Sequence, residues 1–125
     1  MIHQGPIPYV VHIVLDYLLG AFLIVAPFLL GYDSGAATAV SIVLGVGLLV
    51  VTSSTDSRIS LVDAIPIPVH VLLDIGAGIL AIASPFLFGF SDESAPTAIF
   101  IATGVLEFLL VIGTRFPRQE RTVTA

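Results

Sequence analysis

The chain has 125 residues, of which 57% are hydrophobic and 10% are charged, and its mean hydropathy is +1.11. Soluble domains usually carry about 25% charged residues, so this composition leaves too little polar surface for a water-soluble globule and predicts a membrane protein. The net charge of −5 argues against a nucleic-acid partner, and the absence of cysteine excludes disulfides, thiolate metal sites and a cysteine nucleophile.

Four apolar runs follow one another along the chain, at residues 9–30, 36–52, 68–89 and 96–113. A helix of about twenty residues, rising 1.5 Å per residue, crosses the roughly 30 Å hydrocarbon core of a bilayer. Each run is predicted to be helical, because lipid offers backbone amides no hydrogen-bond partner. The expected fold class is therefore all-α, a bundle of four transmembrane helices.

The segments between these runs are polar. Gly31 and Gly89 begin two short hairpins and suit the left-handed position that ends a helix. Ser94 or Asp92 is expected to cap the fourth helix. The longer connector, near residues 53–67, alternates apolar and polar residues and is expected to lie at the membrane interface.

The second half of the chain repeats the first. At a shift of 58 residues, identical residues coincide at His12/His70, Asp16/Asp74, Gly20/Gly78, Pro27/Pro85, Phe28/Phe86, Leu29/Leu87 and Gly31/Gly89. After one inserted residue the register continues at 59, where Thr38 meets Thr97 and Gly45 meets Gly104. We infer an internal duplication. One compact membrane domain is expected, with a first two-helix repeat at residues 1–58 and a second, with its tail, at residues 59–125.

The arginines predict the orientation. Arg58 lies in the middle connector, and Arg115, Arg118 and Arg121 lie in the tail, which is expected to be frayed. The two short hairpins contain acidic residues and no lysine or arginine. Four spans place both termini on one side, so both termini and the connector are expected to be cytoplasmic in the cell membrane. The two repeats then enter the membrane in the same sense, as parallel repeats.

Residues 26–32 (APFLLGY) and 84–90 (SPFLFGF) resemble the signature of the SPW-repeat family. Members of that family are small prokaryotic membrane proteins with a Ser-Pro-Trp motif in the first of two helices per repeat. Here phenylalanine stands in place of tryptophan, and Ala26 stands in place of serine in the first copy. The resemblance implies a multi-pass membrane protein and no established reaction.

Each repeat has a proline four residues before the glycine that ends its first helix, Pro27 in one and Pro85 in the other. Proline lacks an amide donor and pushes out the preceding turn, so a kink or a loosened last turn is expected there. The aromatic residues beside it are expected to anchor the helices at the outer interface. A ligand pocket under the kink is the alternative interpretation.

Each first helix also carries a polar and small stripe at spacings of four, four and seven residues. The stripes are His12, Asp16, Gly20 and Pro27 in one repeat, and His70, Asp74, Gly78 and Pro85 in the other. Because carboxylates avoid lipid and small residues let helices approach, we expect the two stripes to face each other or the bundle centre. Glu107 is expected at the same depth, and its counterpart in the first repeat is Leu48.

Three functions are compatible with this layer of His12, Asp16, His70, Asp74 and Glu107. Hydrogen-bonded His–Asp pairs would fix the helices of a structural or accessory bundle, which is the favoured interpretation. A proton or cation relay through the same groups is the second. The third is a haem held by the two histidines or a divalent metal held by histidine and aspartate.

Catalysis finds no support in the pattern, because the chain has neither a phosphate-binding glycine loop nor an identifiable serine–histidine–aspartate set. We therefore expect a protein that is not an enzyme, with no resident cofactor or metal. The expected partners are the lipid bilayer and either further copies of the chain or a larger membrane complex.

Overall fold

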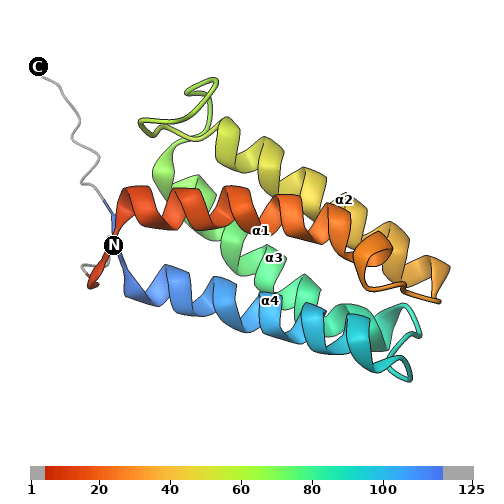
Figure 1. The fold of residues 1–125 in the computed structure, drawn as a ribbon. Helices are drawn as coiled ribbons and strands as arrows, with labels where there is room; N and C mark the ends of the chain where they lie inside the picture. Colours follow the sequence, from red (N-terminus) through yellow and green to blue (C-terminus); the bar gives the residue numbers. More distant parts are fainter. Residues whose placement is uncertain (1–4, 117–125) are drawn as a thin grey trace, which may run out of the picture.

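The computed structural model describes residues 5–116. The elements are β1 (Ile7–Pro8), α1 (Tyr9–Leu29), α2 (Gly35–Ser53), α3 (Ile67–Leu87), α4 (Ser94–Gly113) and β2 (Thr114–Arg115). Consecutive helices run in opposite directions, so both short hairpins lie at one end of the bundle and the middle connector at the other (Figure 1). Helix α1 packs on α2, and α3 packs on α4. The predicted fold class, four membrane helices in two tandem parallel repeats, is confirmed.

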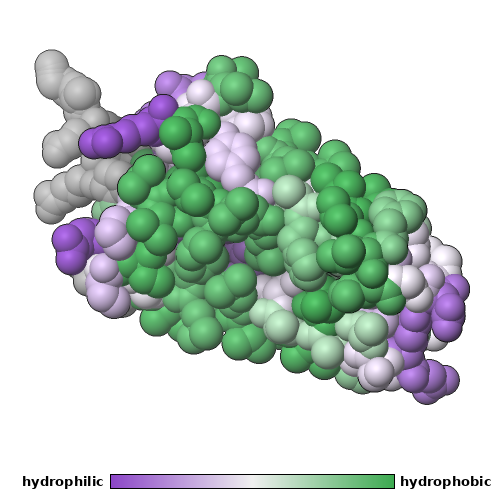
Figure 2. Space-filling model, viewed as in Figure 1, coloured by the Kyte–Doolittle hydropathy of each residue, from purple (hydrophilic) through white to green (hydrophobic). Residues whose placement is uncertain are grey.

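All four helices are long and apolar enough to cross a membrane. Their ends lie within two residues of the predicted ones. Large apolar side chains point outward, as at Val43 and Leu72, which are 70% and 68% exposed. Figure 2 shows hydrophobic residues along the flank of the bundle and hydrophilic residues gathered at its two ends. The chain is a small multi-pass membrane protein.

Both hairpins close as predicted. Gly31 and Gly89 have positive φ angles of 66° and 74°. The amide of the residue after each glycine donates to the carbonyl of the helix proline, from Tyr32 to Pro27 at 3.0 Å in the first repeat. This pattern satisfies carbonyls that the last helical turn would otherwise leave unpaired.

The proline in α1 removes the amide that would normally bond to the carbonyl of Leu23. The hydroxyl of Ser41, on α2, donates to that carbonyl instead, at 2.5 Å. A neighbouring helix therefore replaces the hydrogen bond that Pro27 cannot make, as is common for prolines in membrane helices.

The predicted cap of the fourth helix is wrong. The residue at the N-cap of α4 is Glu93, between the expected Asp92 and Ser94, and its side chain does not bond to its own helix. Its carboxylate instead accepts from the amides of Asp33 and Ser34, at 2.6 and 3.0 Å, in the hairpin of the other repeat. The free amides at the start of α2 attract a carboxylate more strongly than a hydroxyl, so the two hairpins are joined at this end of the bundle.

The segment after α4 also differs from prediction at its start. Arg115 was expected in a frayed tail, but it belongs to β2, where Pro8 and Arg115 pair in parallel register. Its Nε also donates to the carbonyl of Gly5, at 3.3 Å. The rest of the predicted tail, with Arg118 and Arg121, lies outside the described residues.

The glycines of each stripe pack inside their own repeat. A Cβ built on Gly45 would lie 2.6 Å from the carbonyl oxygen of Gly20, and one on Gly104 would lie 2.6 Å from that of Gly78. The small residues of each stripe therefore serve to pack α1 against α2 and α3 against α4. Only glycine allows the two backbones to approach this closely. The polar half of each stripe faces the other repeat.

Candidate functional site

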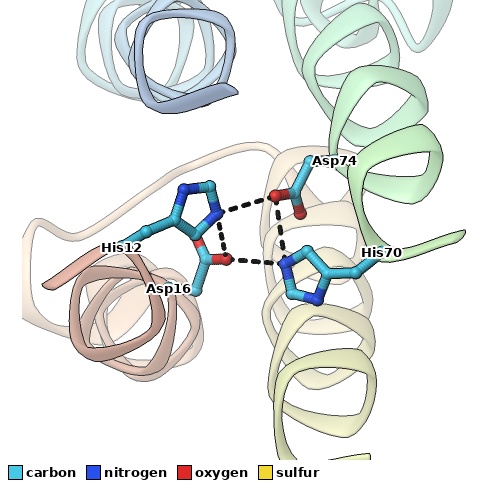
Figure 3. A group of neighbouring side chains, drawn as sticks. All are labelled: His12, Asp16, His70 and Asp74. Carbon is cyan, nitrogen blue, oxygen red and sulfur yellow. Dashed lines mark hydrogen bonds and ion pairs between the residues drawn. The ribbon is translucent and has the colours of Figure 1, made fainter. Parts of the chain in front are cut away.

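Four buried side chains from the first turns of α1 and α3 meet inside the bundle, toward the end that carries the connector. His12 and Asp16 lie one turn apart on α1, and His70 and Asp74 occupy the same positions on α3. Figure 3 shows the four side chains pointing toward one another across the gap between these helices. The expectation that the polar parts of the two stripes face each other holds in the structure.

The four side chains form a closed ring, which we call the His–Asp ring. Nε2 of His12 lies 3.0 Å from Oδ2 of Asp16 and 2.9 Å from Oδ2 of Asp74. Nε2 of His70 lies 3.0 Å from the same oxygen of each aspartate. The sequence suggested two separate pairs, one per helix, whereas each histidine contacts both aspartates. Two nitrogens and two oxygens thus alternate around a common centre.

The outer nitrogen of each imidazole bonds to a threonine. Nδ1 of His12 lies 2.8 Å from Oγ1 of Thr114, and Nδ1 of His70 lies 2.9 Å from Oγ1 of Thr55. The hydroxyl of Thr55 donates its one proton to the carbonyl of Val51, at 2.6 Å, so its oxygen must accept from the histidine. Nδ1 of His70 therefore carries a hydrogen, and Nε2 faces the ring.

These threonines are exchanged between the repeats. Thr114 belongs to the second repeat and orients the histidine of the first, while Thr55 of the first orients the histidine of the second. Parallel backbone pairings hold both threonines, Ile7 with Thr114 and Thr55 with Ile65. Sequence reasoning missed the two threonines, although the 59-residue register that aligns Gly45 with Gly104 also aligns Thr55 with Thr114.

A family model for the SPW repeat domain matches residues 10–114, which include the whole ring and Thr114. The chain belongs to the SPW repeat family. The resemblance noted in the proline segments is therefore confirmed. Comparison with curated proteins and with solved structures gave no match. Membership of the SPW repeat family agrees with the membrane topology, and the role of the ring has to be argued from its geometry.

A further acidic residue of the SPW repeat chain lies beside the ring and has no acidic counterpart in the other repeat. Glu107 on α4 is 1% exposed, and its carboxyl group lies beside those of Asp16 and Asp74. Within residues 5–116, neither of its oxygens has a hydrogen-bond partner, and Oδ1 of each aspartate also lacks one. The equivalent residue on α2 is the buried Leu48. Four carboxylate oxygens without donors therefore lie in the core of the bundle.

A groove connects this region with the lipid-facing side of the SPW repeat bundle. It lies between α2 and α3 and has a volume of about 380 Å³. Its walls are mostly apolar side chains such as Val43, Leu44 and Leu72, and the buried Asp74 and Glu107 also line it. Apolar walls with a few convergent polar groups are typical of ligand sites.

The prolines of the two stripes lie away from the ring. Pro27 and Pro85 are buried near the hairpin end of the bundle. Phe28 and Phe86, next to them, are 71% and 64% exposed, as expected for side chains that face lipid or the interface. Phe90, in contrast, is buried against Phe100, with ring centroids 5.0 Å apart. The structure therefore brings together the polar residues of the predicted site and leaves the prolines as helix-end residues.

Two kinds of chemistry suit the ring. Protons shared between imidazole and carboxylate can hold it together, or a metal ion can bind at its centre, since one ligand atom from each residue lies within 4.8 Å of the others. A haem between the histidines is not favoured. Each Nε2 contacts both aspartate oxygens, so the carboxylates occupy the space that a macrocycle would need.

Proposed function

We propose that this SPW repeat chain is a small accessory membrane bundle without catalytic activity, in which the His–Asp ring clasps the two repeats together. The supporting observation is the crossing of the ring: each histidine bonds an aspartate and a threonine of the other repeat. Hydrophobic burial does not drive helix association in lipid, so buried hydrogen bonds and close packing have to supply it.

The surroundings of the ring favour this role over proton movement. Between the ring and the hairpin end, the polar side chains of the described helices carry hydroxyl groups. Those of Ser41, Ser84 and Thr97 donate to backbone carbonyls. A relay needs titratable groups or water in sequence across the membrane, and these hydroxyls already donate their protons to backbone carbonyls.

We propose that the bundle lies in the cell membrane with both termini and the connector on the cytoplasmic side. Arg58 and Arg115 lie at the ring end of the described chain, and the two hairpins at the opposite end carry only acidic charges. Basic residues accumulate on the cytoplasmic side of short loops. The His–Asp ring then lies in the cytoplasmic half of the bilayer.

The partner of an accessory bundle is further copies of the chain or a larger membrane complex, which would contact the exposed apolar helix faces. Native mass spectrometry after extraction in mild detergent tests this proposal. We expect a discrete assembly heavier than one 13.1 kDa chain. A purely monomeric chain under conditions that preserve known membrane complexes would contradict it.

Proton handling is the second candidate, because Glu107 has two buried oxygens without donors. Proton flux into liposomes distinguishes the two roles. The accessory role predicts equal flux with the wild-type chain and with empty vesicles. A wild-type flux that disappears in Glu107→Gln, but not in the exposed connector variant Asp63→Asn, would overturn the accessory role and favour the relay.

A further inference from the structure

We propose that the His–Asp ring binds one divalent transition-metal ion. The ligand atoms are Nε2 of His12 and His70 and Oδ2 of Asp16 and Asp74, and Glu107 adjoins them. The inference rests on the clasp described above and adds a cation to it. It depends on four observations: the spacing of the ligand atoms, the orientation of the histidines, the unbalanced carboxylates and the mixture of ligand types.

The spacing fits a metal ion. Metal–nitrogen and metal–oxygen bonds of this class are about 2.0–2.2 Å long, so neighbouring ligand atoms lie about 3.0 Å apart at right angles and about 3.4 Å apart in a tetrahedron. The neighbouring atoms of the ring are separated by 2.9–3.0 Å on all four sides. All four also lie within 4.8 Å of one another, as the ligand atoms of a single ion do.

The histidines are oriented as metal ligands usually are. A ligating histidine almost always donates its other ring hydrogen to a fixed acceptor, which sets the tautomer and the direction of the ring. Thr55 fills this role for His70, because its hydroxyl proton is already donated to a backbone carbonyl. Thr114 occupies the same place beside His12. In a neutral imidazole, the lone pair of Nε2 therefore points at the ring.

The negative charges of the buried carboxylates around the ring favour the binding of a cation. Asp16, Asp74 and Glu107 are all buried, and four of their oxygens have no donor within residues 5–116. The four helices contain no lysine or arginine. A buried carboxyl group has to be protonated, paired with a cation or bound to a metal, and a dication offsets two negative charges at one point.

The ligand types select the class of ion. Two imidazoles and two carboxylates suit Zn²⁺ and neighbouring divalent ions such as Co²⁺, Fe²⁺ or Ni²⁺, whereas Mg²⁺ and Ca²⁺ prefer oxygen ligands alone.

The experiment uses the full chain carrying a tag without histidines, purified in mild detergent without chelator. Metal content is measured by inductively coupled plasma mass spectrometry. Chelator-treated protein is then titrated with Co²⁺ while the visible absorption is recorded. We expect saturable binding of about one ion per chain, and a loss of about tenfold or more in affinity in Asp16→Asn/Asp74→Asn. Asp63→Asn, which removes an exposed carboxylate, should bind like the wild type.

The wild-type titration needs no variant, so a folding defect cannot hide the answer. Failure of chelator-treated wild type to bind Co²⁺, Zn²⁺, Fe²⁺ or Ni²⁺ at a saturable site overturns the proposal. Equal binding by a folded Asp16→Asn/Asp74→Asn variant also overturns it. If the wild type binds no metal but ring variants still unfold more easily, the metal site fails and the clasp stands. If metal binds but ring variants keep full stability without it, the clasp fails and the site stands.

Discussion

Nε2 of His12 lies 2.9 Å from Oδ2 of Asp74, although 62 residues separate them in the chain. This contact joins α1 to α3, two helices that belong to different repeats. Close packing holds each repeat together, through glycines whose backbones almost touch. Buried polar contacts at the ring join one repeat to the other. The two levels of the bundle therefore depend on different forces, and substitutions can separate them.

A double-mutant cycle on His12→Gln and Asp74→Asn should reveal this coupling. Each single change leaves a buried polar partner unsatisfied and should lower the free energy of unfolding by about 1–3 kcal/mol. The double variant should lose less than the sum, by a coupling energy of about 0.5–3 kcal/mol. Chemical denaturation in detergent, followed by circular dichroism, measures both. Strictly additive losses would show that the two side chains act independently.

Replacing Glu107 by leucine should stabilise the metal-free protein. The carboxyl group is buried without a donor, which costs about 1–3 kcal/mol, and the first repeat already places a leucine at the equivalent position. Thermal unfolding of chelator-treated protein should show a higher midpoint for Glu107→Leu. The reciprocal change, Leu48→Glu, should lower it. A lower midpoint in Glu107→Leu would mean that the acid makes a stabilising contact after all.

Two glycines on α2 provide a matched test of the packing within a repeat. A Cβ on Gly45 would meet the carbonyl oxygen of Gly20 at 2.6 Å, whereas one on Gly47 would meet nothing within 4 Å. Gly45→Ala should therefore destabilise the bundle by about 1–3 kcal/mol through overpacking. Gly47→Ala should be neutral or stabilising, because alanine favours helix by up to about 1 kcal/mol. Similar unfolding midpoints for the two variants would refute the close approach of α1 and α2.

The proposed orientation can be tested with single cysteines, because the natural chain has none. Ser91 lies exposed in the second hairpin, and Ala64 lies exposed in the connector. A membrane-impermeant maleimide added to intact cells should label Ser91→Cys, and it should label Ala64→Cys only after permeabilisation. The reverse pattern would place both termini outside the cell.

Periodicity and the internal repeat were sufficient to predict the helices, their alternating direction and the common level of the polar residues along the bundle. They did not predict which aspartate each histidine contacts. The spacing of four residues places His12 beside Asp16 on its own helix, whereas its contact with Asp74 depends on how the two repeats pack. Thr55 and Thr114 were missed because they lie beyond the helix ends, where the helical periodicity stops, although the 59-residue register aligns them. Glu93 was missed for a similar reason, since its partners belong to the other hairpin.

The exchange of Thr55 and Thr114 has a consequence for the origin of the chain. A polypeptide with one unit has the histidine and the aspartate, but the threonine that orients its histidine and the second half of its ring lie in the other unit. Two identical polypeptides facing each other would complete the same arrangement, so a single unit would need a second copy of itself to form the ring. Glu107 occupies the position equivalent to Leu48. The two units can differ in this way only within one fused chain, because two copies of a single polypeptide carry the same residue at both positions.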